Sequence, residues 1–76
     1  MQEKIMEILQ SVRPDIDFAK EQALIDDGLL ESFDVIQIMT TFMDEFDVYI
    51  DADDIEPENL NSFDAICAFL TQKIGS

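Results

Sequence analysis

Apolar residues recur along three segments of the chain at the spacing of an amphipathic helix. The first segment covers residues 2 to 12 and ends before Pro14, the second covers residues 32 to 46, and the third begins after Asn61-Ser62. The apolar stripes consist of Ile5, Ile8, Leu9 and Val12; of Val35, Ile38, Met39, Phe42 and Phe46; and of Phe63, Ile66, Cys67, Leu70 and Ile74. The pattern therefore predicts three main helices, each with one face turned toward a shared core.

The connecting segments lack this periodicity. Residues 13 to 31 contain a turn signal at Asp26-Asp27-Gly28 and separated apolar anchors, which are Ile16, Phe18, Leu24, Ile25 and Leu29. A long loop with short helical turns at most is expected there. Val48-Tyr49-Ile50 has strand-forming residues but no second strand to pair with, so we expect an extended linker. Pro57 suits the first turn of a short helix over residues 57 to 60.

These predictions combine into an all-α fold. We expect a small four-helix bundle, with three main helices, a short third helix and a long loop between the first two helices. The 76 residues leave room for a single core, so residues 1–76 are predicted to be one domain. Apolar residues make up 47% of the chain, which is too many for a disordered segment. We also expect the domain to be a monomer.

The balance of charge limits the classes of partner. Four basic residues face eighteen acidic ones, for a formal net charge of −14. Such a field repels nucleic acid and anionic lipid surfaces, and it attracts proteins with basic patches. An acidic surface with no particular partner, or an acidic mimic of nucleic acid, has the same composition. The longest uncharged stretch, residues 35 to 43, is too short to span a bilayer, and the first ten residues are not a signal peptide. A cytoplasmic location is expected, and the lone cysteine agrees with it.

Few side chains could carry out catalysis. The chain has no histidine, which removes the commonest general base and metal ligand. Cys67 lies in an apolar stripe, where a buried and inert thiol is expected. The run Asp51-Ala52-Asp53-Asp54 begins like a calcium-binding EF-hand loop, but Ile55, Glu56 and Ser62 occupy three of the positions that define the loop. We therefore predict neither an enzyme nor a metal site.

The most informative motif is Gly28-Leu29-Leu30-Glu31-Ser32-Phe33, where a glycine turn, two leucines and an acid precede a serine that begins an amphipathic helix. It resembles the phosphopantetheine attachment motif of acyl carrier proteins and peptidyl carrier domains, usually Gly-x-Asp-Ser-Leu or Gly-Leu-x-Asp-Ser. Residues 44 to 50 look like the end of that family's second helix and the loop after it, and residues 61 to 66 look like the start of its last helix. The likeness is closest to free-standing carriers of the D-alanyl carrier protein type.

The resemblance implies an acyl-carrier-like fold and a single carrier domain. It implies that Ser32 accepts a 4'-phosphopantetheine arm from coenzyme A through a phosphopantetheinyl transferase. The arm would carry a thioester-bound acyl or aminoacyl group from an adenylating or acyl-loading enzyme to downstream acyl-transfer enzymes. The transferase supplies the base and Mg²⁺, so the lack of histidine is expected. The residues predicted to contact partners are Phe33 and the acids Glu31, Asp34, Asp44, Glu45, Asp47, Glu56 and Glu58.

Two positions depart from the usual signature. Glu31 stands where Asp is usual and Phe33 where Leu or Met is usual, and both changes could narrow which transferase accepts the protein. Ser32 also has a structural interpretation as the N-cap of the second helix, although Val35 occupies the position of a capping-box partner. Ser62 is the comparison, since it lacks the Gly-Leu-Leu-acid approach, and we assign it the structural role of a cap.

A second functional hypothesis is an unmodified, carrier-shaped acidic adaptor that binds basic proteins. The cargo also stays open, because fatty acyl, polyketide, aminoacyl and D-alanyl carriers share this scaffold. Five bulky side chains could fill the space between the helices, which favours a short polar or aminoacyl cargo: Phe42, Met43, Phe46, Phe63 and Phe69.

Overall fold

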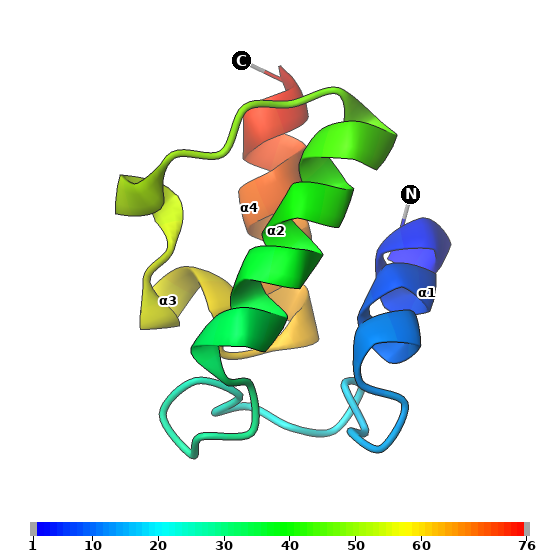
Figure 1. Ribbon diagram of the computed structural model, residues 1–76, viewed down its shortest axis with the longest axis vertical. Coiled ribbons are helices and arrows are strands. Elements are labelled where there is room, and N and C mark those ends of the chain that lie inside the picture. Colours follow the sequence, from blue (N-terminus) through cyan, green and yellow to red (C-terminus); the bar gives the residue numbers. More distant parts are fainter. Residues whose placement is uncertain (1, 76) are drawn as a thin grey trace.

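The computed structural model describes residues 2–75, and over that range the chain is all-helical with no β-strand (Figure 1). The elements are α1 (Gln2–Val12), α2 (Ser32–Phe46), the 3-10 helix η1 (Ala52–Asp54), α3 (Pro57–Leu60) and α4 (Phe63–Gly75). The three main helices and the short helix before the last are confirmed, as are the long loop over residues 13 to 31 and the extended linker after α2.

The helices form a small bundle, in which α2 is seen in front of α4 in the view of Figure 1. Helix α1 packs against both α2 and α4, while α3 packs against α4. The long loop crosses one end of the bundle from α1 to the start of α2, and the linker after α2 returns along the side of the bundle to α3 (Figure 1). This path places α3 near the first turns of α2, although the two helices begin 25 positions apart in the chain, at Ser32 and Pro57.

The predicted apolar faces meet in one core. Ile5, Leu9, Phe42 and Leu70 are completely buried, and they come from the three main helices. The long loop contributes to the same core, because its side chains Ile16, Phe18, Leu24 and Leu30 are buried. Burying a side chain of this size stabilises the fold by roughly 1.5–3 kcal/mol, so the loop is held by its own anchors. Of the five bulky side chains that could fill the space between the helices, Phe42 and Phe69 are buried, whereas Met43, Phe46 and Phe63 are only partly buried.

Two local features were not predicted. The 3-10 helix η1 forms in the acidic segment, where the Asp51 N–H donates to Asp54 Oδ2 at 3.0 Å and the Asp54 N–H donates to the Asp51 carbonyl at 3.0 Å. An ion pair of 2.6 Å between Asp54 Oδ2 and Lys73 Nζ then ties η1 to α4. Phe69 is buried although it lies outside the predicted stripe of α4, since α3 and the linker cover a second side of that helix.

Candidate functional site

Ser32 is the first residue of α2, and its side chain is exposed. The alternative interpretation of Ser32 as the N-cap does not hold, because Glu31 occupies that position with extended backbone angles (φ −90°, ψ 166°). The Glu31 carbonyl accepts the first hydrogen bond of the helix from the Val35 N–H, at 3.0 Å. The Glu31 N–H donates to Asp34 Oδ2 at 3.2 Å, which is the contact made by the third helical residue of a capping box.

The hydroxyl of Ser32 is therefore not used by the helix that it begins. Among residues 2–75, no group hydrogen-bonds it. Ser62 behaves in the opposite way, since its Oγ accepts a hydrogen bond from the Ala65 N–H at 3.1 Å and the residue is buried. The structural role predicted for Ser62 is confirmed. Of these two serines, each at the start of a helix, only Ser32 presents a free hydroxyl to solvent.

The approach to Ser32 depends on the backbone conformation of Gly28. Its φ of +73° is one that glycine adopts far more readily than residues with a Cβ. This turn lets the Gly28 N–H donate to the Ile25 carbonyl and the Leu30 N–H donate to the Leu24 carbonyl, both at 3.0 Å. Leu30 is buried and the next two residues are exposed, so the chain passes from the core to the surface just before Ser32.

Asn61 fixes the beginning of this approach segment. Its Oδ1 accepts hydrogen bonds from the backbone N–H groups of Ile25 and Asp26, at 3.0 and 3.1 Å. Its Nδ2 donates to Asp26 Oδ2 at 3.1 Å, and its carbonyl accepts from the Leu24 N–H at 2.9 Å. Sequence reasoning assigned Asn61 only to the start of the last helix, because nothing local indicates partners 35 and 36 residues away.

Arg13 fixes the end of the same segment. Its Nη1 donates to the Leu29 carbonyl at 2.9 Å and to Asp34 Oδ2 at 2.7 Å, while Nε and Nη2 donate to the two carboxylate oxygens of Asp15. These hydrogen bonds raise the pKa of Arg13 above its ordinary value and hold the pKa of Asp15 below its usual range. Sequence reasoning missed Arg13, although it is the only arginine in the chain and follows directly after α1.

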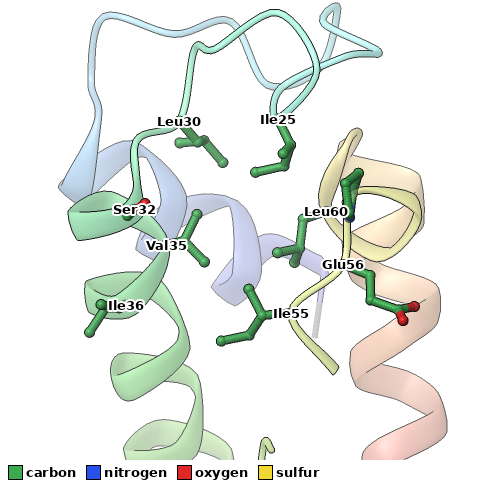
Figure 2. A pocket seen from close by; sticks show the side chains of 9 residues that line it. Ile25, Leu30, Ser32, Val35, Ile36, Ile55, Glu56 and Leu60 are labelled. Carbon is green, nitrogen blue, oxygen red and sulfur yellow. The ribbon is translucent and has the colours of Figure 1, made fainter. Parts of the chain in front are cut away.

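A groove of about 320 Å³ opens beside Ser32 (Figure 2). Side chains from the loop, the first turns of α2 and the segment that leads into α3 face one another across it, as Figure 2 shows. Its lining is mostly apolar and consists of Ile25, Leu30, Ser32, Val35, Ile36, Ile55, Glu56, Pro57 and Leu60. Ser32 contributes its hydroxyl on one side, and the Glu56 carboxylate points away from the groove on the other (Figure 2).

The residues predicted to contact partners separate into two groups. Glu31 and Phe33 flank Ser32, and Phe33 is 73% exposed. Glu56 lines the opposite side of the groove just before α3, and Glu58 follows in the first turn of α3 but does not line the groove. Ile36 also belongs here, since its side chain is 60% exposed one turn after Phe33.

The other residues predicted to contact partners lie far from Ser32 or already form an ion pair within the protein. Asp44 lies twelve residues further along α2, about 18 Å along the helix axis. Glu45 is beside it and pairs with Lys4 at 3.5 Å, and Asp47 ends the helix with a left-handed φ of 53°. The side chain of Asp34 is only 13% exposed and pairs with Arg13.

No protein-family model, curated protein or solved structure matches the chain. Its function therefore has to be argued from the site. Within residues 2–75, no group of three or more acidic or sulfur side chains is arranged to hold a metal ion. Over the same range, no helix has the length and apolar character needed to cross a membrane. Cys67 is buried, and burial raises the pKa of its thiol.

Proposed function

We propose that this chain is a carrier protein that bears a 4'-phosphopantetheine arm on Ser32 and passes a thioester-bound acyl or aminoacyl group between partner enzymes. The observation that carries the proposal is the state of the Ser32 hydroxyl, which is exposed, takes no part in capping and lies at the start of a 15-residue helix. The resemblance of residues 28 to 33 to a phosphopantetheine attachment motif supports the same residue.

The surroundings of Ser32 suit a covalently attached phosphodiester. The first backbone N–H groups of a helix have no intrahelical acceptors, and together with the helix dipole they favour negative charge. The Glu31 carboxylate opposes this effect, but at an exposed site such an interaction is worth about 1 kcal/mol or less. Asp34 opposes it less than the sequence suggests, because its charge is paired with Arg13.

Attachment needs no catalytic group from this chain. The Ser32 Oγ would attack the phosphorus of coenzyme A that bears the pantetheine group. A P–O bond forms to Ser32, the P–O bond to the remaining nucleotide breaks, and adenosine 3',5'-bisphosphate leaves. A phosphopantetheinyl transferase takes the proton of the hydroxyl. The thiol at the end of the attached arm is then the group that carries cargo.

Partner enzymes would recognise the surface around Ser32. Phe33 and Ile36 form an exposed apolar pair on the first two turns of α2, with the exposed Glu31 just before them in the chain and Glu56 on the opposite side of the groove. Exposed aromatic side chains contribute more to most protein interfaces than peripheral charges do. We therefore place the main contact at Phe33 and Ile36, while Asp44 and Glu45 would meet only partners large enough to cover the whole of α2.

The shape of the interior supports a short cargo. Phe42 is completely buried in the core, and the rings of Phe42 and Phe46 lie 6.0 Å apart. The groove beside Ser32, at about 320 Å³, is at the small end of ligand pockets, whose volumes run from roughly 300 to 1,000 Å³. A short acyl or aminoacyl group fits this volume better than a long chain.

The proposal is tested by incubating the purified protein with coenzyme A and a broad-specificity phosphopantetheinyl transferase, followed by intact-mass measurement. We expect the mass to increase by one phosphopantetheine group in the native sequence and in Ser62→Ala, and no increase in Ser32→Ala. An unchanged mass with every transferase tried, together with partner binding that survives in Ser32→Ala, would support an unmodified acidic adaptor instead.

A further inference from the structure

One guanidinium group joins three parts of the chain that meet around Ser32. Arg13 follows the last residue of α1, and its Nη1 reaches both the Leu29 carbonyl and Asp34 Oδ2, at 2.9 and 2.7 Å. The same Asp34 oxygen accepts from the Glu31 N–H at 3.2 Å. Ser32 therefore lies in a segment that is held by Arg13 before it, at Leu29, and after it, at Asp34.

Asp15 determines where the guanidinium points. Its two carboxylate oxygens accept from Nε and Nη2 at 3.0 and 2.8 Å, an arrangement that uses one edge of the planar group. The remaining nitrogen, Nη1, is then directed at Leu29 and Asp34. A lysine has no planar fork and could not hold the carboxylate of Asp15 and the two other acceptors in the same way.

Without the cation, the start of α2 would have to rearrange. The side chain of Asp34 is only 13% exposed, so its charge would be left poorly solvated and close to the exposed Glu31. The Leu29 carbonyl would also lose the hydrogen bond that Arg13 donates. Both changes act on the residues on either side of Ser32, whereas the core side chains below them do not depend on Arg13.

We infer that Arg13, oriented by Asp15, is a positioning residue for the modification of Ser32. It does not contact the reacting atoms; it holds residues 29 to 34 in the conformation that presents the Ser32 hydroxyl to a transferase. This inference rests on the proposed function. The reaction should be sensitive to such positioning, because a displacement of about 1 Å can cost an enzyme reaction about a hundred-fold in rate.

The test compares Arg13→Ala with Lys4→Ala. Each variant removes one positive charge from an ion pair with an acid on α2, but the partner of Lys4 is Glu45, at the end of α2 remote from Ser32. With a broad-specificity phosphopantetheinyl transferase and coenzyme A, we expect Arg13→Ala to lower the kcat of modification at least about ten-fold while its KM changes less than about two-fold. Lys4→Ala should leave both values unchanged.

A second measurement identifies the physical cause. Amide hydrogen exchange should become faster at residues 29 to 34 in Arg13→Ala and stay unchanged there in Lys4→Ala. Free guanidinium at millimolar concentration should restore part of the kcat of Arg13→Ala, and Arg13→Lys should stay impaired. Should Arg13→Ala fail to fold, Asp15→Ala removes only the exposed orienting carboxylate and is expected to lower kcat in the same direction by a smaller factor.

The possible failures can be told apart. Equal kcat values for the native sequence, Arg13→Ala and Lys4→Ala would overturn the positioning role while leaving the carrier proposal in place. An equal loss in Arg13→Ala and Lys4→Ala would overturn it as well, because the effect would then be one of net charge. No modification of the native sequence by any transferase would overturn both.

Discussion

The backbone N–H of Glu31 lies 3.2 Å from Oδ2 of Asp34, and this hydrogen bond helps to begin α2 without any contribution from the side chain of Ser32. In many helices a serine at the N-cap position accepts a hydrogen bond from a backbone N–H of the first turn, and its hydroxyl is then part of the fold. Here Glu31 occupies the N-cap position and the side chain of Asp34 accepts the hydrogen bond from its N–H, so the Ser32 hydroxyl is not used. A structural role as a cap and a free hydroxyl would otherwise be difficult to combine at one residue.

This arrangement predicts that the two helix-start serines differ in their effect on stability. Ser32→Ala should change the free energy of unfolding by less than about 0.5 kcal/mol, because it removes no hydrogen bond. Ser62→Ala removes the acceptor of the Ala65 N–H and should cost about 1 kcal/mol. Urea denaturation of the three proteins measures both values. A cost for Ser32→Ala as large as that for Ser62→Ala would show that Ser32 is a structural residue.

The turn before Ser32 predicts a second effect on stability. Gly28 has a φ of +73°, and a Cβ added there would meet no atom within 4 Å, so the effect of Gly28→Ala comes from backbone strain alone. We expect a loss of about 1 kcal/mol in the free energy of unfolding. Gly75→Ala is the matched control, since it also adds a Cβ in open space but has no positive φ. Equal effects of the two variants in urea denaturation would contradict this explanation.

The ion pair between Asp54 and Lys73 predicts a dependence on acid. The hydrogen bond from Lys73, followed by that from the Asp51 N–H, holds the pKa of Asp54 below its ordinary value. A lowered pKa in the folded state contributes stability that is complete above the ordinary Asp value of about 3.9 and is lost as the pH falls through the lower, folded value.

The measurement compares the native protein with Lys73→Met. The difference between their melting temperatures should be largest near pH 5 and should shrink as the pH falls through the lowered pKa of Asp54 and its carboxyl becomes protonated in both proteins. Titration of the Asp54 carboxyl by NMR should show its midpoint moving toward the ordinary value in the variant. A midpoint that is the same in both proteins would show that Lys73 does not act on Asp54.

Recognition by the transferase is predicted to depend on the apolar surface beside Ser32. Phe33 and Tyr49 are aromatic residues of equal exposure, 73% and 74%, but Tyr49 lies beyond the other end of α2. Phe33→Ala should raise the KM of modification about ten-fold, which corresponds to about 1.4 kcal/mol of binding free energy, while Tyr49→Ala should not change it. Equal KM values for the two variants would place the contact elsewhere.

Local signals predicted most of the fold. Each α-helix could be predicted because it has either an apolar stripe or a proline at its first turn. This holds for residues 2–12, 32–46 and 57–60, and for the last helix after Ser62. The 3-10 helix at Ala52–Asp54 was not predicted, since the hydrogen bonds that form it lie within a run of acidic residues that has no apolar periodicity.

The candidate site was predicted less completely, for a physical reason. Its nucleophile, Ser32, and its glycine turn belong to one continuous motif and could be proposed from the sequence. The groups that position them are distant in the chain: Arg13 lies 21 residues from Asp34, and Asn61 lies 36 residues from Ile25. Only folding brings such pairs together, and the sequence therefore suggested a free Asp34 where the structure has a paired one.

The central claim is that Ser32 carries a phosphopantetheine arm, and the most direct measurement is the intact mass of the protein isolated from its native host. We predict that a fraction of the native sequence carries the additional mass of one phosphopantetheine group, that peptide mapping places it on Ser32, and that Ser32→Ala expressed in the same host has none. Protein that is always unmodified in its host, or a modification that persists in Ser32→Ala, would contradict the account.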